Sequence, residues 1–179
     1  MFQTNRILAL CLICVAVAMP TKQTQAAESG PVRVLFLGHE ATHHRSNDYF
    51  PMLARALGRD AIYFDYVTSV EQALGDANYL NKFDALLLYA NHGTITKTQW
   101  TNLKTFVGTG GGFLPIHCAS WCFANEPDFD KLVGGRFAHH KGAIFRPKTV
   151  STHPAVKDVP LLEAWDETYV HKNHNESQR

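Results

Sequence analysis

The chain has 179 residues, of which 45% are hydrophobic and 18% are charged, and its 17 Lys and Arg residues nearly balance its 16 Asp and Glu residues. These values are typical of a single globular domain and exclude a disordered tail or a basic nucleic-acid-binding arm. Because there is no excess of positive charge, binding to nucleic acid or to anionic lipid is not expected.

The first 27 residues have the pattern of a secretory signal peptide. Arg6 supplies the positive start, an apolar run follows, and Ala26 and Ala27 offer a small-residue cleavage site. The run from residue 7 to residue 19 contains 13 residues, fewer than the roughly 20 that cross a bilayer as a helix. We therefore expect an exported protein, periplasmic or secreted, with no membrane segment after cleavage; a retained membrane anchor is the less favoured alternative.

Cysteine and histidine are distributed unevenly about that cleavage site. Cleavage would remove Cys11 and Cys14 and leave Cys118 and Cys122, which are too few for a disulfide framework. All 10 histidines follow the site. Since imidazole suits both metal ligation and proton transfer near neutral pH, this excess points to a histidine-based site.

From residue 31 to residue 179 the sequence alternates short apolar runs with amphipathic segments and shows no second domain boundary. Ser46 and Thr96 are expected to cap helices, and Pro115 would be unfavourable in a central strand. Alternation of this kind predicts a three-layer α/β sandwich with a mainly parallel sheet. The expected strands are 32–37, 61–67, 85–89 and 113–116, and the expected helices are 46–57, 70–80 (with a connector) and 96–107.

The last 50 or so residues are less regular. We expect a short helix at 128–135, strand-like pieces at 136–140 and 143–150, and one more strand at 165–171.

Three of the four expected strands end in a histidine: His39, His92 and His117. Because the carboxyl ends of parallel strands meet at one edge of a sheet, these imidazoles are expected to converge there. His43 and His44 lie on the loop after the first of them. The alternative is that all are unrelated loop histidines.

The segment 110–120 resembles a nucleophile elbow, in which a strand enters a helix through a tight turn flanked by small residues. Its register places His117 at the apex, where imidazole is suited to metal binding or proton transfer. Cys118 as a nucleophile is the less favoured interpretation, since a reactive thiolate needs exposure and a base. For Cys118 and Cys122, a disulfide, two buried thiols and a metal site all stay open.

Near the end, residues 165–169 read Trp-Asp-Glu-Thr-Tyr, and His171 and His174 follow. Carboxylates beside aromatic rings suit sugar recognition or acid/base chemistry, which makes Asp166 and Glu167 candidates. A solvated edge strand is the alternative.

Together these blocks resemble the ThuA-like (trehalose utilisation) family, whose fold is similar to that of class I glutamine amidotransferases. The resemblance covers residues 31–179 and rests on four stretches. It implies a flavodoxin-like sheet, a link to carbohydrate metabolism and, in some members, a bound metal. The stretches are 34–39, 86–91, the Gly-Gly-Gly-Phe-Leu-Pro-Ile-His block ending at His117, and 165–169.

The chain also departs from that superfamily. Amidotransferases carry a cysteine at the elbow, whereas this chain has His117 at the apex. Glutamine hydrolysis is therefore not expected. The family domain runs on beyond the Asp-Glu-x-Tyr block, so the resemblance implies that an edge strand and a closing helix are missing here.

Our leading hypothesis is an exported protein that processes a saccharide or an oxidised sugar. His39, His92 and His117 are the expected ligands of a divalent metal, zinc first, and His117, Asp166 and Glu167 are the expected catalytic residues. One alternative is a non-catalytic sugar-binding or accessory module of a larger exported assembly. Another is a cysteine hydrolase that uses Cys118.

Overall fold

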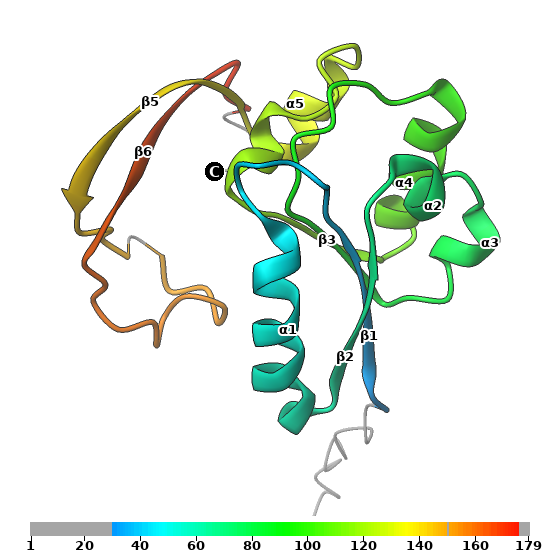
Figure 1. The fold of residues 1–179 in the computed structure, drawn as a ribbon, viewed down its shortest axis with the longest axis horizontal. Coiled ribbons are helices and arrows are strands. Elements are labelled where there is room, and N and C mark those ends of the chain that lie inside the picture. Colours follow the sequence, from blue (N-terminus) through cyan, green and yellow to red (C-terminus); the bar gives the residue numbers. More distant parts are fainter. Residues whose placement is uncertain (1–29, 150, 176–179) are drawn as a thin grey trace, which may run out of the picture.

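The computed structural model describes residues 30–149 and 151–175, so the expected signal peptide lies outside the described residues. The helices and strands follow one another along the chain as in Figure 1. They are β1 (Val32–Leu37), α1 (Ser46–Leu57), β2 (Ile62–Val67), α2 (Val70–Leu74), α3 (Ala77–Leu80), β3 (Ala85–Leu88), α4 (Lys97–Gly108), β4 (Gly112–Pro115), α5 (Asp128–Val133), β5 (Arg136–Phe145) and β6 (Ala164–Lys172).

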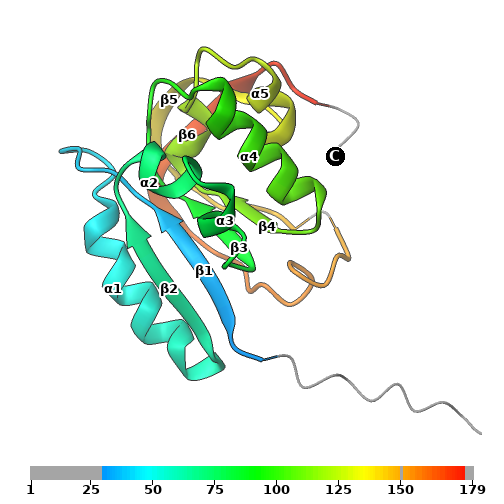
Figure 2. The ribbon, with the colours of Figure 1, turned by 90° about the vertical axis from the view of Figure 1, so that its right-hand side faces the viewer.

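The central sheet is parallel, with the strand order β2-β1-β3-β4. Helix α1 covers one face, and α2, α3 and α4 lie on the other (Figures 1 and 2). The three-layer α/β architecture expected from the sequence is thereby confirmed. Within the described ranges, no helix has both the length and the apolar character that crossing a membrane requires.

Successive side chains of a strand point to opposite faces of the sheet, and here both faces are apolar. Leu35 and Leu37 belong to the larger core, together with Leu103 of α4. Phe36 belongs to the smaller core, against which Phe50 of α1 packs. This double burial explains why β1 and β3 are continuous apolar runs rather than alternating ones.

The two expected helix caps have opposite outcomes. Thr96 caps α4 in a reciprocal capping box with Gln99, as expected. The expectation for Ser46 is wrong, because Arg45 occupies the N-cap position and has no capping side-chain hydrogen bond. The Ser46 hydroxyl is buried instead and accepts a hydrogen bond from the backbone N–H of His39 at 2.9 Å. This serine therefore ties the start of α1 to the end of β1.

Pro115 is compatible with the sheet because β4 is an edge strand among the described residues. The backbone N–H groups of Gly112 and Ile116 donate to the carbonyl oxygens of Asp84, just before β3, and Leu88, at the end of β3, at 2.8 and 2.9 Å. In a parallel pairing, alternate residues direct their N–H groups to opposite sides. Pro115 consequently has its nitrogen on the free side, where no donor is needed.

Strands β5 and β6 form a separate antiparallel hairpin. The two strand pieces expected at 136–140 and 143–150 are in fact one strand that ends at Phe145, which corrects the sequence prediction. A register shift between Phe137 and His139 bends this strand. The hairpin leaves the body beside α5 and arches along the side of the sheet that α1 covers (Figure 1).

Candidate active site

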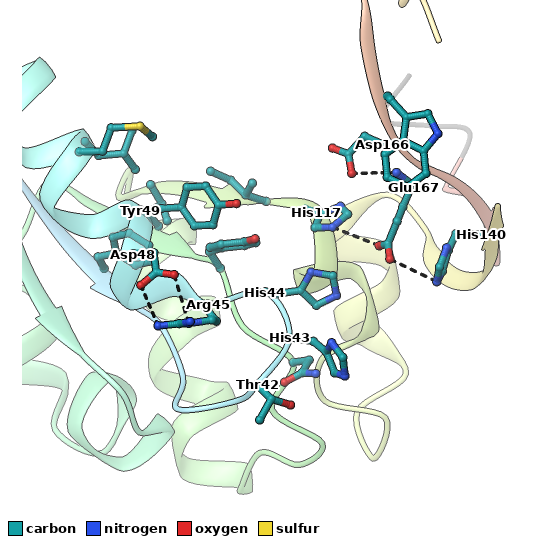
Figure 3. A pocket seen from close by; sticks show the side chains of 18 residues that line it. Thr42, His43, His44, Arg45, Asp48, Tyr49, His117, His140, Asp166 and Glu167 are labelled. Carbon is teal, nitrogen blue, oxygen red and sulfur yellow. Dashed lines mark hydrogen bonds and ion pairs between the residues drawn. The ribbon is translucent and has the colours of Figure 1, made fainter. Parts of the chain in front are cut away.

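The carboxyl edge of the sheet, the start of α1 and the hairpin enclose a cavity of about 1040 Å³ (Figure 3). Loop residues after β1, the segment after β3, the 3₁₀ turn His117–Trp121 after β4, and β6 all contribute to its wall or floor. The cavity lies where a doubly wound sheet places its ligands. Its lining residues at this edge include His43, His44, Tyr89, Asn91, His117, His140, Asp166 and Glu167.

His117 occupies the apex of the elbow, as the sequence predicts. Its φ of +52° lies in the left-handed region, where a non-glycine residue is strained. The Tyr169 ring stacks on the imidazole at 4.4 Å, and the His44 ring meets it edge-on at 4.7 Å. His44 also has a positive φ, +55°. Backbone strain at two residues whose rings are in contact is typical of functional sites.

Glu167 approaches His117 from the hairpin (Figure 3). Its Oε2 lies 3.4 Å from His117 Nε2, and its Oε1 lies 3.5 Å from His140 Nε2. Oε2 is buried, and the approach of His117 does not satisfy hydrogen-bond geometry, so this oxygen has no hydrogen-bond partner. A buried carboxylate oxygen left in this way is costly and calls for a cation or a donor.

His44, His117 and Glu167 form the one group of potential metal ligands among residues 30–149 and 151–175 whose ligand atoms all lie within 4.8 Å of one another. Two imidazoles and a carboxylate are a ligand set that zinc accepts. Burial, followed by the neighbouring His117, lowers the pKa of His44 below its ordinary value. The neutral imidazole that can bind a metal is therefore the favoured form of His44.

His39 and His92 lie beside this group but do not join it within the described part of the chain. His39 is buried; its Nε2 donates to the carbonyl oxygen of His44 at 2.7 Å, and its Nδ1 lies 2.6 Å from Asn91 Oδ1. His92 Nε2 donates to the carbonyl oxygen of Gly38 at 2.9 Å. These two histidines hold the loops, and His39 in particular positions His44. The structure thus places His44 and Glu167 where the sequence prediction had His39 and His92.

Two partly buried histidines outside the candidate ligand group, His92 and His171, give the fold a pH dependence. Burial lowers the pKa of His92 below its ordinary value of 6.5; the hydrogen bond to Gly38 partly opposes this shift, and the neighbouring His39 adds a smaller lowering. Burial, followed by the neighbouring His174, also lowers the pKa of His171. Between the unfolded and folded pKa values the unfolded chain therefore binds more protons, so stability rises with pH.

We expect the unfolding free energy of the metal-free protein to fall as the pH is lowered from about 7.5 to about 5.5. Urea denaturation in the presence of a chelator measures this. The His92→Gln variant should show a flatter dependence, and an unchanged slope in that variant would contradict the assignment.

Asp166 and Tyr89 complete the polar end of the cavity, and Tyr169 lies behind them against His117. Asp166 lines the cavity, and its Oδ1 accepts a hydrogen bond from the backbone N–H of Glu167 at 2.8 Å. Burial, followed by the nearby Cys118, raises the pKa of Tyr89 to about 12, and burial followed by Glu167 raises that of Tyr169. Both phenols stay protonated at neutral pH, and Tyr89, which lines the cavity, can donate a hydrogen bond to a ligand.

Cys118 and Cys122 are buried free thiols, so the disulfide that their spacing allowed does not form. Burial raises the pKa of Cys118 to about 12, which leaves almost no thiolate near neutral pH. Cys122 Sγ donates to the carbonyl oxygen of Ala90 at 3.0 Å. The geometry gives no support to the alternative of a Cys118 nucleophile.

Of the remaining histidines near the end of the chain, His171 supports the elbow: its Nε2 lies 3.1 Å from Ser120 Oγ, and this hydroxyl donates to the carbonyl oxygen of His117. The sequence pattern alone assigns His140 no role in the site. Its cross-strand pairing with Tyr169 places it on the face that carries Glu167, and the strand alternation is the signal that would have found it.

The sequence model of a family described as ThuA, trehalose utilisation, matches residues 33–179. The chain belongs to the ThuA family. None of the curated proteins matches it.

Two solved structures of ThuA-like proteins are similar to this ThuA chain. One, from Bacteroides uniformis ATCC 8492, has a TM-score of 0.66 at 17% identity over 88% of this chain and 66% of that one. The other, from Parabacteroides merdae ATCC 43184, has a TM-score of 0.49 at 14% identity over 77% of this chain and 49% of that one. The first likeness supports the fold; this chain spans 66% of the length of that relative.

Proposed function

We propose that this ThuA-family chain is exported and processes a saccharide or an oxidised sugar with the help of a divalent metal, zinc first, held by His44, His117 and Glu167. The observation that carries the proposal is the buried Glu167 Oε2, which faces an imidazole and has no hydrogen-bond partner. The family's link to trehalose utilisation supplies the substrate class.

The donor set fits such an ion. Two ligands at the usual bond lengths around a tetrahedral zinc are about 3.3 Å apart. Glu167 Oε2 and His117 Nε2 are 3.4 Å apart in this structure. His140 binds the other carboxylate oxygen, as an outer partner of a metal-ligating carboxylate does.

A zinc ion held there would supply a Lewis acid and would lower the pKa of a bound water. The protein's own groups have separate tasks. Asp166, which lines the cavity, accepts protons or hydroxyl hydrogen bonds, and the Tyr89 phenol donates one to a sugar oxygen. Glutamine hydrolysis has no support, since the elbow carries His117 and its neighbouring thiol is buried.

Zinc analysis of the purified protein, combined with a turnover screen on saccharides and oxidised sugars, tests the proposal. We expect one zinc per chain and turnover that a chelator abolishes. The His44→Ala and His117→Ala variants should lose the metal, whereas His153→Ala, an exposed histidine outside the cavity, should retain it. Equal metal content in all three variants would remove the site. Saccharide binding without turnover would favour the accessory-module alternative.

A further inference from the structure

The cavity is larger and more apolar than a single sugar ring requires. Its volume of about 1040 Å³ is at the upper end of the roughly 300–1,000 Å³ that drug-sized ligands occupy. The candidate metal ligands occupy only one end. At the other end the lining is apolar: Phe36, Met52, Leu53, Leu87, Ile116 and Trp165.

Each wall changes from polar to apolar in the same direction, away from the candidate metal ligands. Along the chain at the end of β3 the change runs from Asn91 and Tyr89 back to Leu87, and just after β4 it runs from His117 back to Ile116. On α1, which begins at the site, Asp48 and Arg45 pair with each other and Met52 follows one turn later. On β6, Trp165 shares a face with Glu167 because side chains alternate.

Several of these apolar side chains are exposed. Met52 is 56% exposed and Trp165 is 74% exposed. The Trp165 indole lies across Gly142, where an added Cβ would come within 2.9 Å of the ring. Exposed apolar side chains gathered beside polar groups mark a binding surface.

We infer that the sugar carries an apolar substituent, an aryl or long-chain alkyl aglycone, that packs on Met52, Ile116 and Trp165 while the sugar ring faces His117 and Glu167. This inference rests on the proposed function and narrows its substrate class. A second sugar ring gains less there, because Met52 and Ile116 offer its hydroxyls no hydrogen-bond partner. An apolar group loses no hydrogen bonds there and gains burial.

Calorimetric titration of the zinc-loaded protein with three probes tests the inference: methyl glucoside, 4-nitrophenyl glucoside and a disaccharide of two glucose units. We expect the aryl glucoside to bind at least about tenfold more tightly than either of the others. Met52→Glu should lower the affinity for the aryl glucoside to that for the methyl glucoside and leave the methyl glucoside and zinc content unchanged. Val159→Glu, at an exposed apolar position that does not line the cavity, is the matched control and should keep the preference.

Equal affinity for methyl and aryl glucosides, or tighter binding of the disaccharide, would overturn the inference and leave the proposed function standing. Binding of none of the three, together with no zinc, would instead overturn the proposed function. A dimer in sedimentation that the Met52→Glu change dissociates would also overturn the inference, because a second copy would then cover the apolar end.

Discussion

Replacing Glu167 with glutamine should lower the affinity for Zn²⁺ by more than about a hundredfold, because loss of a ligand exceeds the 10- to 100-fold cost of losing an outer partner. The same change should make the metal-free protein more stable by about 1 kcal/mol. Glu167 Oε2 is buried without a hydrogen-bond partner, and a neutral amide removes the cost of burying that charge. Competition with a chromophoric chelator measures the affinity, and urea denaturation with excess chelator measures the stability.

Asp166→Asn is the matched control for Glu167→Gln. It changes the adjacent residue of the same strand from the same charge to the same amide, and it retains the oxygen that accepts the Glu167 N–H. We expect its Zn²⁺ affinity to stay within about threefold of the unmodified protein. If the asparagine variant loses the metal and the glutamine variant keeps it, the ligand assignment is wrong.

The expected loss of Zn²⁺ affinity and gain of stability in Glu167→Gln have one physical origin. A carboxylate placed to bind a cation is strained electrostatically when no cation is bound, so stability and binding are in conflict at that position. The left-handed backbone of His44 and His117 fits the same interpretation.

The central sheet could be predicted because its strands are buried on both faces and therefore read as unbroken apolar runs. The elbow could be predicted because the tight turn restricts the residues around His117. The hairpin strand could not be predicted as continuous, since Lys141 and Gly142 interrupt its apolar pattern. In the structure the Trp165 indole lies over Gly142, where a side chain would have to displace it.

The ligand group could be predicted only in part. Strand ends locate His39, His92 and His117 at one edge, but the path of the loop decides which imidazole faces the cavity. His39 turns inward to bond Asn91 and the His44 carbonyl, and the loop then presents His44. No periodicity in the sequence encodes that turn. Glu167 could be named as a candidate from its neighbours, but its distance from His117 depends on how the hairpin docks.

The contacts that attach the hairpin to α5 are expected to make a large contribution to the unfolding free energy. Arg136 starts β5, and its guanidinium donates to Asp130 Oδ1 at 2.7 Å and to the carbonyl oxygens of Trp121 and Cys122, both at 2.9 Å. Asn173, just after β6, donates to the other oxygen of Asp130 at 2.9 Å. One buried carboxylate on α5 therefore holds the base of both strands.

Replacing Arg136 with methionine should lower the unfolding free energy by about 3–5 kcal/mol, because it leaves the Asp130 charge buried without its ionic partner. The pair is 13% and 7% exposed, so solvent cannot compensate. The matched control is Arg146→Met, which breaks the exposed pair with Glu163 and should cost less than about 1 kcal/mol. Urea denaturation of the metal-free variants measures both changes.

A double variant shows whether the buried charge is the cause. If it is, Arg136→Met combined with Asp130→Leu should be less destabilised than Arg136→Met alone, because no unpaired charge then stays in the interior. Arg136→Met should also weaken Zn²⁺ binding although Arg136 is no ligand, because β6 brings Glu167 to His117 only while the base of the hairpin is fixed. Full zinc affinity in a protein that has lost this stability would mean that Glu167 is positioned by its own contacts with His117 and His140 rather than by the anchor on α5.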